Sequence, residues 1–200
     1  MLTSDKSKSP PATDGRVRRS ERSRAAIVQA LFELIGEGVL APTADEVADR
    51  ASIGIRTVFR QFKDMDTLYG ALDVLIYERF EPVFLAPVPE GSIEERIDEF
   101  VARRAKGYEG VAPYKRAANV KRARSEFLQE RHEAVVSRMS KDLRRWFPEL
   151  KRMDAATMHA LELVTSFEAW DRLRVDQRLG KQRAAEAMKQ AMTALLDVRG

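Results

Sequence analysis

The strongest constraint on the fold is the helical spacing of the apolar residues. Ile27, Leu31, Leu34 and Ile35 recur at helical spacing, so they form one stripe on a helix that begins near Ser23. No segment alternates convincingly between apolar and polar residues, as a half-buried strand does. The chain has only 10 Gly and 8 Pro, few for an all-β sandwich, and 44% hydrophobic residues, which is enough for a core. We therefore expect an all-α fold.

Two short helices are predicted next, around a turn of small residues. Thr43-Ala44-Asp45-Glu46 is a capping box, in which the threonine hydroxyl and the glutamate carboxylate each accept a backbone N–H of the other residue. The helix that starts there breaks at Ser52-Ile53-Gly54. A second helix runs from Ile55 to about Phe62, with Val58 and Phe62 on one face. This pattern predicts a helix-turn-helix.

Positive charge is concentrated in the same segment. Residues 50–63 contain Arg50, Arg56, Arg60 and Lys63 and no acidic residue, which gives a charge of +4. Arg56 and Arg60 are four positions apart and share a helix face, while Val58 and Phe62 face inward. Arginine donates two hydrogen bonds to O6 and N7 of guanine in the major groove. We predict that Arg56, in the first turn, reads a base edge.

A set of residues between Arg24 and Leu68 matches a known pattern. It comprises Ile27, Ala30, Gly38, Thr43, Val47-Ala48, Ala51-Ser52-Ile53, Thr57-Val58-Phe59-Arg60-Gln61-Phe62, Asp66 and Leu68. With these residues, and with the loop length between Gly38 and Thr43, the segment resembles the DNA-binding domain of the TetR family of transcriptional regulators. The resemblance implies an N-terminal three-helix helix-turn-helix domain and a C-terminal helical domain for ligand binding and dimerisation.

The resemblance also implies which residues hold DNA. They are Thr43, Arg56, Thr57, Phe59 and Arg60, and we add Ile55 and Lys63 to the predicted DNA-binding set. Some positions depart from the family: Ser52 and Arg56 stand where glycine is frequent, so the preferred DNA sequence should differ from that of glycine-bearing relatives. Phe59 replaces the usual tyrosine and has no hydroxyl for a phosphate. Met65 stands where lysine is usual, and Lys63 is the candidate substitute.

The N-terminal residues differ in composition from the rest. Residues 1–17 contain Ser, Pro, Lys and Asp and almost no large apolar side chains, which predicts a disordered tail. The tail leads into a basic run interrupted only by Glu21: Arg16, Arg18, Arg19, Arg22 and Arg24. Two interpretations stay open, an exposed helix start and an arm that reaches DNA phosphates.

Prolines mark the boundary between two parts of the chain. Pro82, Pro87 and Pro89 exclude a continuous helix across residues 81–91. We therefore expect a DNA-binding domain at residues 18–80, whose last helix connects the two parts, and a C-terminal domain at residues 81–200. Within the latter, a capping box at Ser92–Glu95 begins one helix. Further helices are expected at 113–122, 125–147, 154–175 and 181–198.

The resemblance implies that the C-terminal helices form a ligand pocket and that the last two pack into a dimer interface. The stripe of Ala184, Ala185, Met188, Ala191, Met192 and Leu195 fits such an interface, and it fits a core within one chain equally well. The candidates for contact with a small-molecule effector are Phe100, Arg104, Tyr108, Tyr114, His159, Ser166 and Trp170.

Other classes of function find little support. The chain has no cysteine, which excludes disulfides, thiolate metal sites and cysteine nucleophiles. Neither histidine belongs to a paired Glu-x-x-His motif, and no nucleophile elbow or phosphate loop occurs. We expect no cofactor, no metal and no enzyme activity. We also expect a cytoplasmic protein without a membrane span, which acts as a homodimeric repressor released from a palindromic operator by a small ligand; a ligand-blind DNA-binding protein and, less readily, a helical enzyme remain alternatives.

Overall fold

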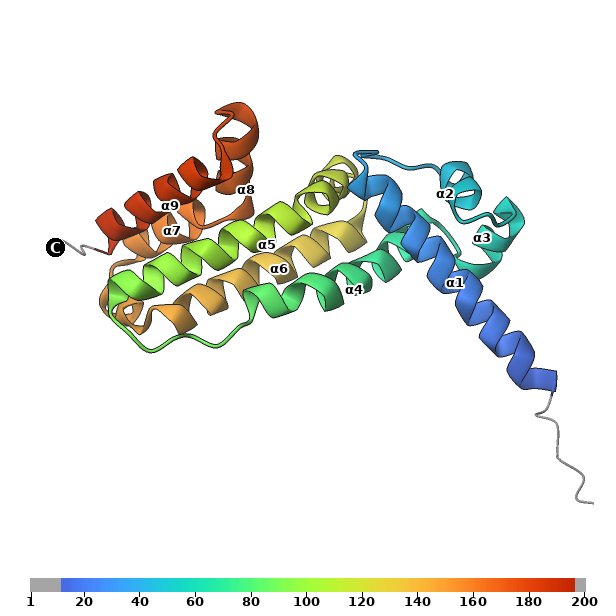
Figure 1. The fold of residues 1–200 in the computed structure, drawn as a ribbon, viewed down its shortest axis with the longest axis horizontal. Coiled ribbons are helices and arrows are strands. Elements are labelled where there is room, and N and C mark those ends of the chain that lie inside the picture. Colours follow the sequence, from blue (N-terminus) through green and yellow to red (C-terminus); the bar gives the residue numbers. More distant parts are fainter. Residues whose placement is uncertain (1–11, 197–200) are drawn as a thin grey trace, which may run out of the picture. The chain divides into compact units, whose positions relative to one another are not determined.

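All regular elements in the described part of the chain are helical, as the sequence predicts. The computed structural model describes residues 12–196 and divides the chain into two compact units, Met1–Leu72 and Asp73–Gly200 (Figure 1). The first unit contains α1 (Ala12–Gly36), α2 (Ala44–Arg50), α3 (Ile55–Gln61) and the start of α4 (Met65–Phe84). The unit boundary lies inside α4, whereas the sequence placed it at the end of that helix.

The core of the first unit is the apolar stripe of α1 with the inner faces of the following helices. Ile27, Leu31 and Ile35 have no exposed surface, and Val58 and Phe62 of the α3 segment are 2% and 1% exposed. The predicted capping box at the start of α2 is confirmed, since Thr43 and Glu46 exchange both hydrogen bonds. These contacts fix the orientation of α3 on α1, and thereby decide which side chains of α3 face outward.

The turn between α2 and α3 contains a strained residue. Ser52 has a φ of 53°, in the left-handed region that glycine adopts most readily. This is the position at which the sequence pattern often has glycine. The serine therefore keeps the turn geometry of a helix-turn-helix at a conformational cost.

Helix α1 begins earlier than the apolar pattern predicts. The expected helix starts near Ser23, but α1 starts at Ala12, so residues 12–17 of the expected tail are helical. The tail was inferred from a lack of apolar side chains, which rules out burial but not helix formation, and arginine is a good helix former. The rest of the expected tail, residues 1–11, lies outside the described residues.

The second unit is a bundle built around α5 (Ile93–Arg122), which packs against α6 (Glu126–Trp146) and α9 (Lys181–Leu195) (Figure 1). A short turn of 3-10 helix, η1 (Pro148–Arg152), joins α6 to α7 (Ala155–Val164). The core contains large aromatic and aliphatic side chains that are at most 1% exposed: Phe100, Leu143, Trp146, Phe147, Leu161 and Trp170. The predicted capping box at Ser92 is present, and Ser125 and Asp154 cap the helices that follow them.

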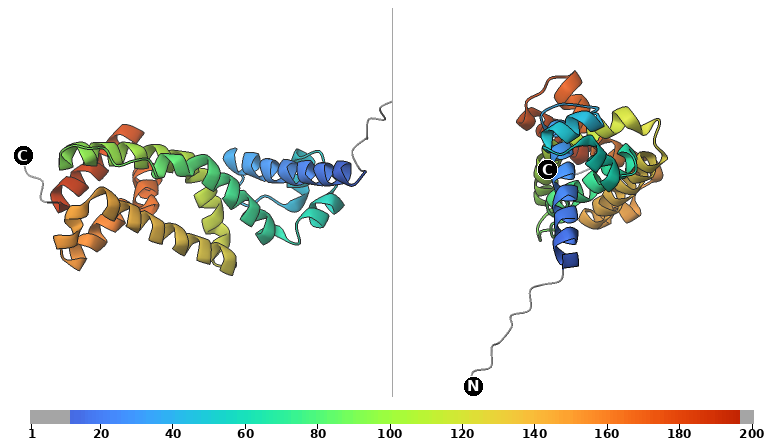
Figure 2. Two further views of the ribbon diagram at one scale, coloured as in Figure 1. Left: turned by 90° about the horizontal axis from the view of Figure 1, so that it is seen from below. Right: turned by 90° about the vertical axis from the view of Figure 1, so that its right-hand side faces the viewer.

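Two prolines do not end helices where the sequence suggested. The expected separate helix at 113–122 is the last part of α5, which continues through Pro113, and α4 continues through Pro82 to Phe84. A proline removes one backbone donor and bends a helix, but packing on both sides can hold the turn together. Figure 2 shows the bend, since the yellow-green end of α5 runs at a steep angle to its green first part.

The expected helix at 154–175 is interrupted. α7 ends at Val164, α8 (Phe167–Asp171) follows, and a π-helical turn, η2 (Arg172–Asp176), completes the segment. The reason lies in two hydroxyl residues: Thr165 donates to the carbonyl of Leu161, and Ser166 accepts the N–H of Ala169 and so caps a new helix. The apolar residues keep their helical spacing across this break, so the sequence pattern does not indicate it.

Candidate nucleic-acid interface and ligand cavity

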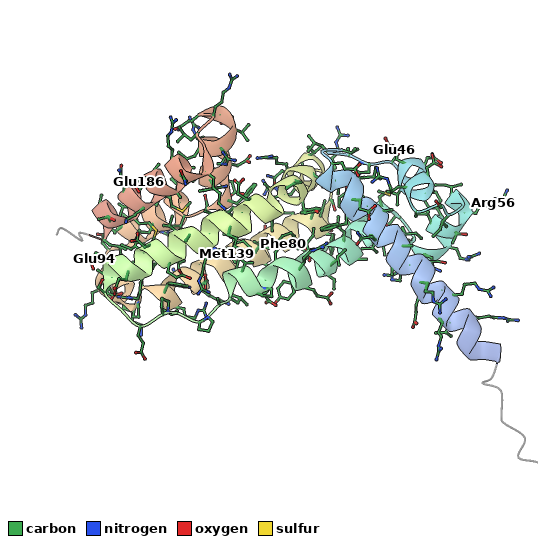
Figure 3. All side chains as sticks on the ribbon, viewed as in Figure 1. Glu46, Arg56, Phe80, Glu94, Met139 and Glu186 are labelled. Atoms are coloured by element: carbon green, nitrogen blue, oxygen red, sulfur yellow. The ribbon has the colours of Figure 1, made fainter. Side chains whose placement is uncertain are left out.

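Helix α3 presents a basic outer face. Val58 turns inward, while Arg56, Phe59 and Arg60 are exposed, with Phe59 53% exposed. Figure 3 shows Arg56 on the side of α3 turned away from α1. Arg56 lies in the first turn and makes no ion pair with any residue that the structure describes. Its guanidinium is therefore available to an external acceptor.

The other predicted DNA-binding residues lie around this face and differ in their exposure and in their hydrogen bonds. Ile55 and Thr57 are half-buried and Lys63 is exposed just beyond the end of α3. The Nη2 atom of Arg60 lies 3.5 Å from the Thr57 hydroxyl. The hydroxyl of Thr43 is occupied by its cap, because it donates to Glu46 at 2.8 Å and accepts the N–H of Glu46 at 3.2 Å.

Arg50 does not belong to the outer face, although the sequence grouped it with Arg56, Arg60 and Lys63. Its guanidinium makes two hydrogen bonds with the carboxylate of Glu37, at 2.8 and 2.7 Å, and lies 3.7 Å from Glu33. The hydrogen bonds from Arg50 hold the pKa of Glu37 below its usual value. Arg50 thus joins α2 to the end of α1.

A contact between α1 and the end of α3 has no signal in the sequence. The side-chain amide of Gln61 donates to the Ser20 hydroxyl at 2.9 Å, and the guanidinium of Arg24 donates to the carbonyl of Gln61 at 3.0 Å. Arg24 also lies over the ring of Phe62, 4.2 Å from its centroid. These bonds fix the N-terminal half of α1 next to α3.

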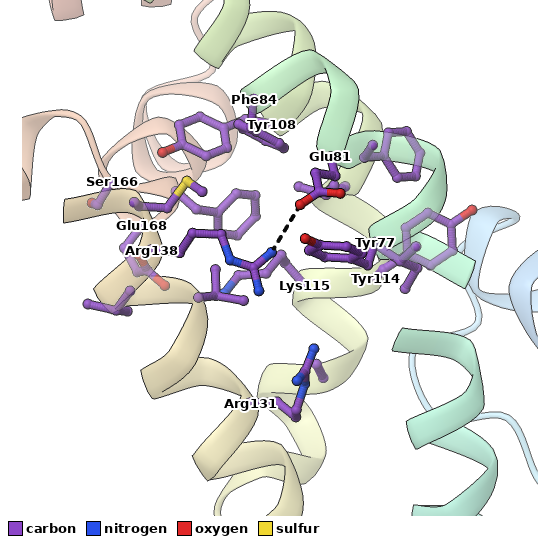
Figure 4. Close-up of a pocket in the computed structure, with 18 of the residues that line it drawn as sticks. Tyr77, Glu81, Phe84, Tyr108, Tyr114, Lys115, Arg131, Arg138, Ser166 and Glu168 are labelled. Carbon is purple, nitrogen blue, oxygen red and sulfur yellow. Dashed lines mark ion pairs between the residues drawn. The ribbon is translucent and has the colours of Figure 1, made fainter. Parts of the chain in front are cut away.

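The second unit contains a mainly apolar cavity of about 220 Å³ (Figure 4). Four segments form its wall, namely the part of α4 from Asp73 onward, α5, α6 and the α7–α8 break. Its aromatic residues are Tyr77, Phe80, Phe84, Tyr108, Tyr114 and Phe167. The cavity is smaller than the pockets of most drug-sized ligands.

Most charged groups around the cavity are paired. Arg138 lies 3.9 Å from Glu81, as Figure 4 marks, and Arg131 is bonded to Asp73. Lys115 has no carboxylate partner among the described residues. Its Nζ atom lies 3.4 Å from Nδ1 of His132, and burial lowers the pKa of Lys115. The cavity therefore offers one amine that a ligand can contact.

The structure separates the ligand candidates into two groups. Tyr108, Tyr114 and Ser166 line the cavity. The others do not: Phe100, Arg104 and Trp170 are buried in the core, and the side chain of His159 is 78% exposed, 3.9 Å from Glu162.

The aromatic residues of α4 that line the cavity were missed. Tyr77 and Phe80 belong to the last helix of the expected DNA-binding domain, and Phe84 follows in the proline-containing boundary segment, so none of them was considered as a ligand contact. A signal did exist in the glycines of α5: a Cβ atom on Gly107 would overlap the ring of Phe84, and one on Gly110 would lie 2.5 Å from Phe80. Glycine inside a helix is typical of such close approach.

Within residues 12–196, no group of three or more His, Asp or Glu side chains is arranged to hold a metal ion. None of the described helices is both long and apolar enough to cross a membrane.

Several solved structures resemble the chain over nearly its whole length. A Mesorhizobium loti protein assigned to the TetR family superposes with a TM-score of 0.67 at 19% identity, over 91% of this chain and 98% of that one. The multidrug-binding protein EbrR, solved with imidazole, superposes with a TM-score of 0.61 at 20% identity, over 95% and 97%. The chain has the fold of the TetR-family regulators.

A third similar structure is that of a transcriptional regulator from Rhodococcus sp. RHA1, with a TM-score of 0.64 at 17% identity, over 90% of this chain and 96% of that one. No family model and no curated protein sequence matches the chain. The fold is thus shared with structures whose sequences are only 17–20% identical to this one. The helix-turn-helix predicted from the sequence corresponds to α2 and α3 of this chain.

Proposed function

We propose that this protein is a sequence-specific DNA-binding transcriptional regulator. The observation that carries the proposal is the outer face of α3, where Arg56, Phe59 and Arg60 project from a helix anchored by Val58 and Phe62. A helix with a buried inner face and long donors on the outer face fits the major groove of B-DNA. Arg56 has the role of base reader, and Lys63 that of a phosphate contact.

The proposed active form is a homodimer that binds a palindromic operator. A single α3 contacts too few base pairs for a unique site, and two-fold symmetric dimers place two such helices about one helical turn apart. The exposed Leu163 of α7, which is 66% exposed, supports an intermolecular contact on the α7 side of the second unit. By contrast, Ala184, Met188 and Met192 of α9 are occupied within the chain's own core.

The proposed regulation is release from DNA when a small ligand fills the cavity. The same helix, α4, carries residues of the first unit at its start and cavity residues such as Tyr77 and Phe80 further along. A ligand that pushes these side chains apart moves α4 and so changes the spacing of the two recognition helices. Such a switch requires that the ligand bind the free dimer more tightly than the DNA-bound dimer.

The decisive experiment selects random double-stranded DNA with the purified full-length protein near physiological salt and sequences the bound fraction. We expect an inverted repeat with guanine at matching half-site positions. A variant with Arg56→Gln and Arg60→Gln should lose it, while Lys106→Gln and Lys141→Gln, which remove two exposed charges from the second unit, should not. Recovery of no motif by the wild-type protein would refute the proposal.

The same operator tests the ligand step. A compound library should be screened by the thermal shift of the protein and each hit titrated against the DNA complex. The release mechanism predicts that hits weaken DNA binding and that Tyr114→Ala changes their affinity. Hits that bind free and DNA-bound protein equally would instead identify a DNA-binding protein that does not respond to ligand through this cavity.

A further inference from the structure

We infer that the N-terminal part of α1 is a second DNA-binding surface, which contacts the sugar–phosphate backbone beside the groove that holds α3. The inference rests on the proposed function, and it goes beyond the helix-turn-helix. The surface is formed by Arg16, Arg19 and Arg22, all exposed and helical. None of the three makes an ion pair with a residue in the described part of the chain.

The spacing of these arginines puts them on one side of the helix. Residues three apart on an α-helix are neighbours, so Arg16, Arg19 and Arg22 form a continuous stripe. The nearby acidic residue, Glu21, is two positions from Arg19 and therefore points to the other side. The stripe presents three positive charges with no negative charge among them.

The N-terminal half of α1, which carries the stripe, is held beside α3 by the contacts of Ser20 and Arg24. Both residues bond to Gln61, the last residue of α3, at 2.9 and 3.0 Å. Arg16 lies four residues before Ser20, so it shares the helix face that meets α3 and extends about 6 Å beyond that contact along the axis. A DNA molecule that holds α3 in its major groove therefore has its backbone next to Arg16, and the stripe continues from Arg16 around α1 through Arg19 to Arg22.

Phosphate is the chemistry that matches this surface. Arginine side chains are long, positively charged donors, and this part of α1 is exposed and has few apolar side chains. Such a surface suits the sequence-independent neutralisation of phosphates rather than a protein interface. Base reading remains with Arg56. The two surfaces should therefore contribute different quantities, α3 the sequence preference and α1 the salt-dependent affinity.

The test measures the affinity of the full-length protein for its selected operator between 50 and 200 mM salt. The variant R16Q/R19Q/R22Q should bind more weakly, and its salt slope should be shallower by roughly 3 per bound protomer, at about 0.9 per lost phosphate contact. The ratio of affinities for the operator and for a copy with one changed base should stay the same. Hydroxyl-radical footprinting should show loss of protection beside each half-site only.

Two further variants complete the test. R16K/R19K/R22K, which keeps the charge, should restore the slope, and K106Q/K141Q/K151Q, which removes three exposed charges from the second unit, should leave it unchanged. An unaltered slope in R16Q/R19Q/R22Q would overturn the inference. So would loss of base preference in that variant, since the arginines would then act through α3. Failure of the proposed function is seen separately, in the wild-type protein, as the absence of any selected sequence.

Discussion

The guanidinium of Arg104 in α5 lies 3.2 Å from the carboxylate of Asp142 in α6, and the two side chains are only 2% and 3% exposed. Arg104 also donates to the carbonyl of Met139 at 3.2 Å and lies 4.7 Å from the centroid of the Phe100 ring. A buried charge is tolerated only when it is paired and hydrogen-bonded. Arg104 therefore joins α5 to α6, and this role replaces the ligand contact that the sequence suggested.

Removal of one partner of this pair should be strongly destabilising. We expect Asp142→Ala to lower the free energy of unfolding by about 3 to 5 kcal/mol, because it leaves Arg104 charged and buried. The half-buried pair of Arg103 and Glu99 within α5 is the control, and Glu99→Ala should cost about 0.3 to 0.5 kcal/mol. Urea titration followed by circular dichroism measures both. Equal costs would show that the buried pair is dispensable.

Arg56 and Lys63 should affect DNA binding in different ways. Arg56→Ala should cost about 1 to 3 kcal/mol at one base position and relax the preference there, because a bidentate contact is lost. Lys63→Ala should weaken binding to all sequences alike and make the salt slope shallower by about one unit. Competition binding to a set of single-base operator variants at two salt concentrations measures both quantities. The opposite pattern would exchange their roles.

Gly107 should be needed for the packing of α4 on α5. Its missing side chain leaves room for the ring of Phe84, so Gly107→Ala forces that ring out and disturbs the cavity wall. We expect a loss of about 1 to 3 kcal/mol, in spite of the better helix propensity of alanine. Gly15→Ala is the matched control in α1, where a Cβ meets nothing within 4 Å. Gly15→Ala should stabilise the protein slightly, and thermal unfolding of the two variants compares the two effects.

Acid should loosen the attachment of α8 and η2 to α5. The carboxylate of Glu109 accepts hydrogen bonds from Arg174 at 2.8 Å and from the indole N–H of Trp170 at 3.0 Å. The bonds from Arg174 lower the pKa of Glu109 below 4.5, its usual value. Because the folded-state pKa is depressed, the contribution to stability is complete above pH 4.5 and is lost as pH falls through the folded pKa.

Glu109→Gln, which cannot ionise, tests this assignment. The variant should be less stable than wild type at pH 7 by about 1 kcal/mol and should approach it as the pH falls below 4.5. Denaturant unfolding followed by tryptophan fluorescence, at several pH values, gives the two curves. Parallel curves would assign the acid sensitivity to other carboxylates, of which Glu149, bonded to Arg96, is the first candidate.

The candidate DNA-binding face could be predicted well because its signals are local. The cap at Thr43 and the inward pair Val58 and Phe62 determine the start and the rotation of two short helices, and Arg56 is then outward by periodicity alone. The role of Arg50, which the sequence shows only as part of the local positive charge, could not be predicted for the opposite reason. Its partner, Glu37, directly follows the end of α1, and no local pattern records that contact.

The cavity could be predicted only in part. Tyr108 and Tyr114 lie on a helix whose apolar residues stand on several sides, so some of them had to face an interior. Whether these residues face the core or the cavity depends on how α4 and α6 approach α5. The aromatic residues of α4 reach the cavity only because Gly107 and Gly110 allow close packing, a fact that becomes meaningful once Phe84 and Phe80 are known to lie against them.

The sequence by itself determined the helical class, the caps and the two-helix DNA-binding motif, because each depends on residues within one or two helical turns of one another. The tertiary structure decided what required distant partners: the ion pair that takes Arg104 out of the ligand site, and the bonds that hold the N-terminal half of α1 beside α3. Local hydrogen bonds and periodicity are encoded in neighbouring residues, whereas long-range packing depends on all the helices at once.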